Sequence, residues 1–292
     1  MPKTNSELKK KILEDIKKTG FVSELKTISL LIDKGWKTEH SETFEDKDEN
    51  KSREIDVLAS KVEYVKELGF RLTINLVIEV KKSDKHWIIF SSKRRIRGLG
   101  WRIMNRTYNT RMDGTTLFGP RIIDSKSPRE TIELVGKAFH EFNKSPNEKS
   151  NIYGALISVS KAAMYFRDRF NDGKPLKNFA PEEETSVSIY LPVVVLDGLL
   201  FEVCTVNKGN IKLKEKDFIP TELSYSSPNY KNEMYASDLF PDIVTYKGLG
   251  TYLNTIEKWR LNMFLEMTES LKKVGKKPAR WYLEFLEIAK KV

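Results

Sequence analysis

Three ionisable residues, Asp56, Glu79 and Lys81, have the types and spacing needed to hold a metal ion beside a phosphate. Glu79 and Lys81 end the run Leu76–Lys81, whose apolar start is typical of a strand. Because strand side chains alternate between faces, both point the same way. Asp56 lies in the apolar segment Arg53–Ala59, a second expected strand. If the strands pair, two carboxylates and an ammonium share one sheet edge, where the acids suit Mg²⁺ and the lysine can steady a nucleophile or phosphate charge.

A helix is expected before these strands, from about Val22 to Lys34, with Gly35 placed to end it. Trp36–His40 then reads as the first strand of the sheet. The helix carries apolar side chains at helical spacing, which we expect to face the sheet. These are Leu25, Ile28, Leu31 and Ile32.

The order of an acidic helix, a strand with Asp and a strand ending in Glu-x-Lys resembles the PD-(D/E)XK nuclease superfamily, and within it Mrr-type restriction endonucleases and archaeal Holliday-junction resolvases. The resemblance covers roughly the first third of the chain. Ile55 stands where the family pattern has proline, although many members lack that proline. The resemblance implies a nuclease using Mg²⁺ or Mn²⁺, with Asp56, Glu79 and the carbonyl of Val80 as metal ligands and Lys81 as catalytic lysine.

Glu24 is the further acid that the resemblance brings to the site, because a glutamate on this helix often joins the metal centre in that family. There it would orient the attacking water or hold a second ion. The alternative is an exposed acid favoured by the positive end of the helix. Glu14 is a competing acid that is less well placed.

Glu-x-Lys alone is weak evidence, because any such pair can lie on a solvated face of a strand. An apolar strand buried on both faces should hold Glu79 and Lys81 only with a partner or a metal ion. A structural ion pair is therefore the alternative to a metal site.

A basic segment follows these strands, from Lys93 to Arg121, with Asp113 as its one acid. It reads as a long connection with little regular structure, whose arginines can contact phosphates and whose aromatics can stack on bases. A solvated loop or a subunit interface is the alternative. The expected nucleic-acid-binding residues are Lys82, Lys93, Arg94, Arg95, Arg97, Trp101, Arg102, Arg106 and Arg111. The acidic stretch Glu42–Asn50, by contrast, is expected to be a mobile, solvated hairpin loop.

Composition favours a globular enzyme with an anionic partner. The 292 residues carry 51 Lys and Arg against 41 Asp and Glu, a net charge of +10. The single cysteine, Cys204, excludes an internal disulfide, and no Cys/His cluster suggests zinc. No run is long and apolar enough to cross a membrane, so we expect a cytoplasmic protein. The resemblance implies DNA as substrate, a restriction, phage-defence or repair setting, and allows a homodimer.

The fold class expected is α/β, a mixed central sheet flanked by helices, with an added β-meander and C-terminal helices. Residues 1–125 would form the catalytic core with its basic loop, and residues 126–292 the remainder, packed with the core as one unit. A capping box at Ser127–Glu130 predicts a helix reaching Asn143. Asp197-Gly198 predicts a hairpin. Further expectations are a helix near 152–166, a strand within 238–245, and helices near 249–271 and 279–290.

Two other functions remain open from the sequence. One is a non-catalytic nucleic-acid-binding protein with a decayed nuclease fold, against which the intact Asp56, Glu79 and Lys81 argue. The other is a sensor-effector nuclease, in which the region after about Ser186 binds a ligand or partner and controls cleavage.

Overall fold

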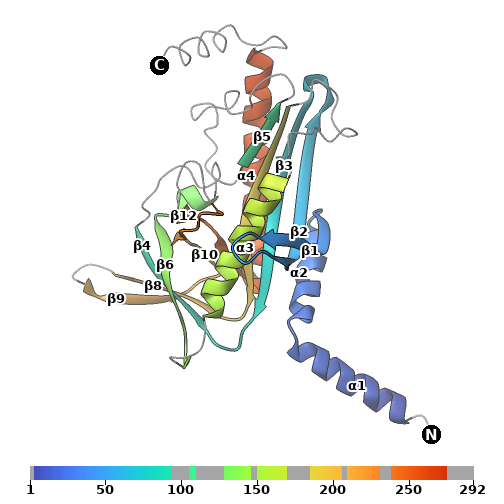
Figure 1. Cartoon of the computed structure of the whole chain (residues 1–292), viewed down its shortest axis with the longest axis vertical. Coiled ribbons are helices and arrows are strands. Elements are labelled where there is room, and N and C mark those ends of the chain that lie inside the picture. The colour runs from blue at the N-terminus through green and yellow to red at the C-terminus, as the bar shows by residue number, and fades with distance from the viewer. Residues whose placement is uncertain are drawn as a thin grey trace.

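The part of the chain that the computed structural model describes forms a seven-stranded sheet, a four-stranded sheet, a two-stranded ribbon and four α-helices. Figure 1 shows their arrangement. The described residues are 3–93, 105–109, 128–145, 150–169, 185–205, 209–230 and 238–274. The helices are α1 (Lys3–Lys18), α2 (Phe21–Asp33), α3 (Asn151–Asp168) and α4 (Tyr246–Val274). None of these described helices combines the length and apolarity needed to span a bilayer.

The larger sheet has seven strands in the order β1-β2-β3-β7-β13-β10, with β5 also paired to β7. β1, β2 and β3 pair antiparallel, whereas β7 runs parallel to both β3 and β13. The fold is therefore a mixed α/β fold, as expected. Its strands are β1 (Lys37–Asp46), β2 (Lys51–Val65), β3 (Phe70–Lys82), β5 (Asn105–Asn109), β7 (Thr185–Asp197), β10 (Phe218–Pro220) and β13 (Asp242–Thr245).

The smaller sheet has four strands in the order β6-β4-β8-β9. β4 pairs antiparallel with β6 and parallel with β8. A separate two-stranded ribbon joins β11 to β12. These strands are β4 (Trp87–Lys93), β6 (Leu134–Glu141), β8 (Leu200–Thr205), β9 (Ile211–Glu215), β11 (Leu223–Ser224) and β12 (Asp238–Leu239).

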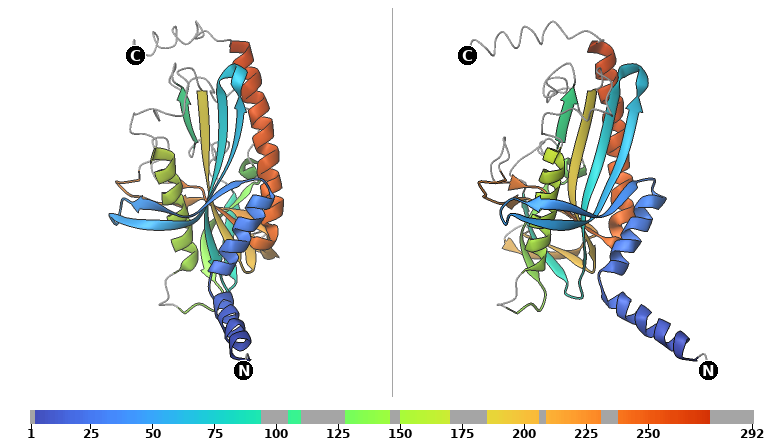
Figure 2. Two further views of the ribbon diagram at one scale, coloured as in Figure 1. Left: turned by 90° about the vertical axis from the view of Figure 1, so that its right-hand side faces the viewer. Right: turned by 45° about the vertical axis from the view of Figure 1, so that its right-hand side comes forward.

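Helices cover both faces of the larger sheet. Figure 2 shows α3 on one side of it and α2 and α4 on the other. Two apolar cores result, one between the sheet and α2 and α4, the other between the sheet, α3 and the smaller sheet. β3 and β7 are buried on both faces, which explains their nearly continuous runs of Val, Ile and Leu.

The helix expected at 128–143 is wrong. A short 3-10 turn at Pro128–Thr131 follows the capping residues, and β6 occupies Leu134–Glu141. Gly136 suits this strand, because a Cβ there would lie 2.3 Å from Cγ2 of Ile89 on β4, with which β6 pairs. The strand approaches its neighbour more closely than any residue other than glycine allows.

The hairpin expected at Asp197-Gly198 is also wrong. β7 and β8 belong to different sheets, and β8 pairs with β4 and β9 instead. The chain crosses close to Ser83 at this point, since a Cβ on Gly198 would meet the Ser83 carbonyl oxygen at 2.6 Å. The glycine therefore serves a close crossing of two segments and not a two-residue turn.

Several other elements agree with expectation. α2, α3 and α4 lie where helices were expected, and Gly35 ends α2 with φ +77°. The expected helix at 279–290 lies outside the described residues. Within α2, however, Leu25 and Ile32 are 59% and 55% exposed, so the expectation that they face the sheet is wrong.

The acidic stretch at the β1–β2 turn is fixed, contrary to the expected solvated loop. Asp46 is buried, and Lys161 of α3, itself buried, donates to both of its oxygens at 2.8 and 3.0 Å. Lys161 also pairs with Asp48 at 2.9 Å, and Tyr225 and Ser227 donate hydrogen bonds to Asp48. Although burial opposes ionisation, these donors hold the pKa of Asp48 below its usual range. The ion pairs tie the β1–β2 turn to α3.

We predict that Lys161→Met strongly destabilises the protein. The change leaves the carboxylates of Asp46 and Asp48 without their cation, and breaking a buried ion pair from one side costs about 3–5 kcal/mol. Urea unfolding at pH 7.5 measures the loss. Lys247→Met is the matched control, because Lys247 is 78% exposed and pairs with Glu215 at 3.9 Å. Equal stability of the two variants would contradict the structural role of Lys161.

Candidate metal centre

The candidate centre lies where β2 separates from β3. Their paired residues run from Val65 with Phe70 to Val57 with Ile78, so the β2 residues before Val57 pair with β1 alone. β3 continues along β7 until Lys82 meets Asp197. The end of β3 is thus open on its β2 side, and Asp56 and Glu79 are the first residues of the two strands beyond the last pair.

Asp56 bridges this opening with its side chain. Its Oδ2 accepts a hydrogen bond of 2.6 Å from the backbone N–H of Val80. Along β3, Lys81 Nζ donates a hydrogen bond of 2.5 Å to Glu79 Oε1, so these two side chains lie on the same face of the strand. Val80, between them, points into the core beside α4. The predicted alternation of side chains along β3 is therefore confirmed. Asp56, Glu79 and Lys81 gather at one point of the sheet.

Ser41 marks the same position on β1. His40 pairs with Val57 and Glu42 with Ile55, which sets Ser41 opposite Asp56. Ser41 has φ +56°, a left-handed conformation that is uncommon for a residue other than glycine. The edge strand is therefore bent at the level of the candidate centre.

α2 brings Glu24 to the centre through contacts that the sequence did not suggest. Ser23, 2% exposed, donates from Oγ to Asp197 Oδ2 at 2.5 Å, which fixes the start of α2 to the end of β7. Glu24 Oε2 then lies 3.2 Å from His40 Nε2 on β1. Glu14, the competing acid, lies exposed on α1. The sequence signal that could have identified Asp197 is its position at the end of the apolar β7 run.

The four ionisable groups influence one another. Burial and the neighbouring Glu79 carboxylate raise the pKa of Asp56 to about 6, with a smaller contribution from Glu24. Burial opposes the charge on Lys81, but the attraction of Glu79, Asp56 and Glu24 outweighs it and raises the pKa of Lys81. Three acids around one lysine leave an excess of negative charge, which a divalent cation would neutralise.

The donor set fits a hard cation such as Mg²⁺ or Mn²⁺. Glu79 Oε2 is buried and accepts no hydrogen bond within the described part of the chain, so an oxygen ligand lies ready for a cation. The described residues hold no group of three or more His, Cys, Asp and Glu side chains able to bind a metal. The proposed ligands are fewer: the carboxylates of Asp56 and Glu79 and the carbonyl of Val80. Such a set suits Mg²⁺, which commonly binds through one or two carboxylates.

Only some of the expected nucleic-acid-binding residues lie in the described part of the chain. Lys82 is exposed at the end of β3, beside the centre, and Lys93 is exposed at the end of β4. Arg106 lies in β5, whose presence modifies the expected irregular loop. Its backbone pairs with Ser188 of β7, whereas Glu79 pairs with Val194 of the same strand. Six residues of β7 therefore separate Arg106 from the candidate centre, a distance of about 20 Å along the strand. The others, Arg94, Arg95, Arg97, Trp101, Arg102 and Arg111, lie outside the described residues.

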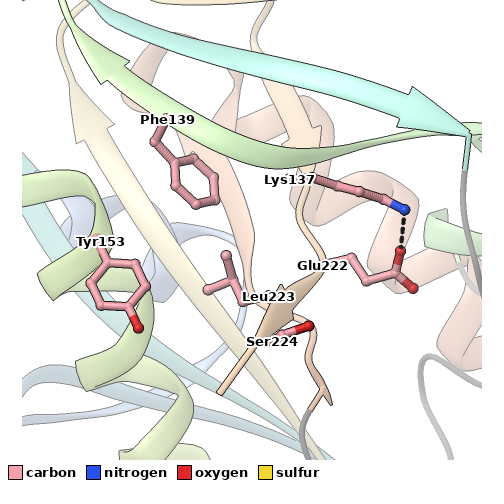
Figure 3. A pocket seen from close by; sticks show the side chains of 6 residues that line it. All are labelled: Lys137, Phe139, Tyr153, Glu222, Leu223 and Ser224. Atoms are coloured by element: carbon pink, nitrogen blue, oxygen red, sulfur yellow. Dashed lines mark ion pairs between the residues drawn. The ribbon is translucent and has the colours of Figure 1, made fainter. Parts of the chain in front are cut away.

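A separate pocket of about 360 Å³ shares no residue with the centre. Figure 3 shows the rings of Phe139 and Tyr153 on one side of it and the ion pair of Lys137 with Glu222, at 3.3 Å, on the other. Its volume lies at the lower end of the range of small-ligand pockets. The lining residues come from β6, α3, β11 and the residue before β11, and are Lys137, Phe139, Tyr153, Glu222, Leu223 and Ser224.

No family model matches the sequence, and neither a curated protein nor a solved structure is significantly similar to it. The class of protein must therefore be inferred from the site itself.

We predict that Asp56→Asn stabilises the metal-free protein. Because the folded-state pKa of Asp56 is raised from 3.8 to about 6, its carboxylate opposes folding at pH values above about 6. The neutral amide removes this penalty, up to about 3 kcal/mol at pH 7.5. Below about pH 3 the acid is protonated in both folded and unfolded states, so the gain should vanish. Thermal unfolding in EDTA at both pH values measures it.

Asp84→Asn serves as the control, since Asp84 is exposed two residues beyond the end of β3. This variant should unfold like the parent protein at both pH values. An Asp56→Asn protein less stable than the parent at pH 7.5 would contradict the raised pKa.

Proposed function

We propose that this protein is a metal-dependent endonuclease that hydrolyses phosphodiester bonds in DNA. The observation that carries the proposal is the position of Glu79, whose Oε1 pairs with Lys81 while its buried Oε2 lacks a hydrogen bond among the described residues, next to Asp56. A purely structural ion pair would be expected to satisfy both oxygens, because an unpaired buried polar atom is costly. A glutamate that binds a cation would instead keep one carboxylate oxygen available for the ion, as Glu79 Oε2 is here.

The proposed mechanism assigns a task to each side chain. Asp56, Glu79 and the carbonyl of Val80 would hold Mg²⁺ or Mn²⁺, which when bound polarises the scissile phosphate and lowers the pKa of a coordinated water. Lys81 orients the attacking water and offsets negative charge on the phosphate as the bond to the leaving oxygen breaks. Glu24 accepts a hydrogen bond from that water, and the His40 ring beside it limits the orientations of its carboxylate.

DNA as the partner is supported by charge. The chain carries a net charge of +10. Lys82, one residue beyond the proposed catalytic lysine, is exposed, and its ammonium donates one hydrogen bond to the Lys17 carbonyl oxygen. The proposal places the protein in the cytoplasm, in restriction, phage defence or repair.

A nuclease regulated through its C-terminal half is the second candidate. The pocket between β6, α3 and β11 supports it, because α3 also packs against β3 and β7 of the central sheet. A ligand that shifts α3 would then act on β3, the strand that carries Glu79. Under this candidate, the purified protein would cut DNA only after a small molecule or partner is added.

We predict that the protein nicks or linearises supercoiled plasmid with Mg²⁺ or Mn²⁺ and not with EDTA. Asp56→Asn, Glu79→Gln and Lys81→Met should each lower the rate at least about 1,000-fold, because each removes a group acting at the reacting phosphate. Agarose gels over time measure the rates. Lys214→Met, an exposed lysine of β9, is the matched control and should cut normally.

Two results would contradict the proposal. One is metal-dependent cutting by Lys81→Met at the parental rate. The other is a gel shift of the plasmid without cutting under any metal condition, which would favour a non-catalytic DNA-binding protein.

A further inference from the structure

α1 projects from the body of the protein, as Figures 1 and 2 both show. Every side chain described in this helix, from Ser6 to Lys18, is exposed. Its C-terminal end is attached to the sheet, because Lys82 Nζ donates a hydrogen bond to the Lys17 carbonyl oxygen. None of the helix side chains from Ser6 to Lys18 is buried against the other described residues.

This helix is nevertheless amphipathic. Leu8, Ile12 and Ile16 recur every four residues and are 56%, 47% and 42% exposed, and Leu13 is 57% exposed. Residues four apart lie on one face of a helix. An isolated helix of this length is only marginally stable in water, and most helical stability in proteins comes from packing such a face. Within the described part of the chain, no surface covers this apolar face.

Exposed apolar residues continue beyond the bend at Thr19 and Gly20. Phe21 and Leu25 of α2 are 62% and 59% exposed, although the opposite face of α2 packs on the core through Leu31. The N-terminal apolar surface, as we define it, consists of Leu8, Ile12, Leu13, Ile16, Phe21 and Leu25.

We propose that the N-terminal apolar surface is covered by the same surface of a second copy of this chain. The six side chains are 42–62% exposed. A symmetric pair that covers both sets would bury on the order of 1,000 Å², close to the lower bound of standard specific interfaces. A two-fold pair needs one self-complementary patch on each copy, and a projecting helix is free to meet its equivalent.

The charges on α1 favour a protein partner over a lipid surface. Its lysines are interspersed with three acids, Glu7, Glu14 and Asp15. A helix that lies on an anionic membrane concentrates Lys and Arg on its polar face, and each acid there would be repelled. Mixed charges of both signs suit pairing of two identical helices, where lysines of one copy can meet acids of the other.

The pairing does not rest on the proposed nuclease function, but it would bear on it. α2 contributes Phe21 and Leu25 to the N-terminal apolar surface and Glu24 to the candidate centre. Pairing through α1 and α2 would therefore hold two centres in one particle, as cutting both strands of a duplex requires.

The test is the mass of the purified full chain, measured by light scattering during size exclusion without metal or DNA. At about 100 µM, well above the dissociation constants usual for standard interfaces, we expect twice the chain mass of 33.9 kDa. Ile12→Glu places a charge in the apolar surface and should weaken pairing at least about 30-fold. Leu213→Glu is the matched control, because Leu213 is 58% exposed on β9. It should pair like the parent.

Far-UV circular dichroism checks that Ile12→Glu remains folded, which is expected because Ile12 contacts solvent in the single chain. A parent chain that stays monomeric at this concentration would overturn the proposal, and so would equal pairing of Ile12→Glu and the parent. Co-sedimentation of a monomeric parent with phosphatidylserine/phosphatidylcholine vesicles, abolished by Ile12→Glu, would assign the surface to lipid instead. Asp56→Asn should pair normally, so failure of pairing and failure of the nuclease proposal are separate results.

Discussion

The separation of β2 from β3 at Asp56 is the constraint on which the candidate centre depends. While the strands are paired, backbone groups satisfy one another and the side chains pack into the two cores. Beyond Val57 and Ile78 that pairing stops, and the Asp56 carboxylate takes over as acceptor for the Val80 N–H. Two acids and a lysine can then occupy this end of β3, a strand that is mostly apolar and buried. The cost of bringing these charges together appears as the raised pKa of Asp56.

The surrounding elements keep this opening in place. β7 holds the end of β3 from the other side, and its Asp197 receives Ser23, which fixes α2 and therefore Glu24. On the far side, the left-handed Ser41 bends β1, and Lys161 ties the β1–β2 turn to α3. The centre is thus built from residues spread from Ser23 to Asp197, and it requires the sheet to combine strands from both halves of the chain.

The sequence predicts the local pattern well and the long-range arrangement poorly. Alternation along β3, the helix over α2 and the glycine that ends it could be inferred, because they depend on neighbouring residues. β6 and the Asp197-Gly198 crossing could not, since Gly136 and Gly198 serve close contacts with Ile89 and Ser83, far away in the chain. His40 and Asp197 could not be placed at the centre from the sequence for the same reason, because their partners Glu24 and Ser23 lie far away in the chain. The exposure of Leu25 was misjudged because helical spacing identifies an apolar face without showing what covers it.

The most direct test of the central claim is the position of Mn²⁺ in a crystal of the protein soaked with that ion. The account predicts an anomalous-scattering peak within about 2.0–2.4 Å of carboxylate oxygens of both Asp56 and Glu79, with Glu79 Oε2 among its ligands. It also predicts that the peak disappears in Glu79→Gln. An empty centre at saturating Mn²⁺, with the Glu79–Lys81 ion pair unchanged, would contradict the account and leave these residues as a structural ion pair.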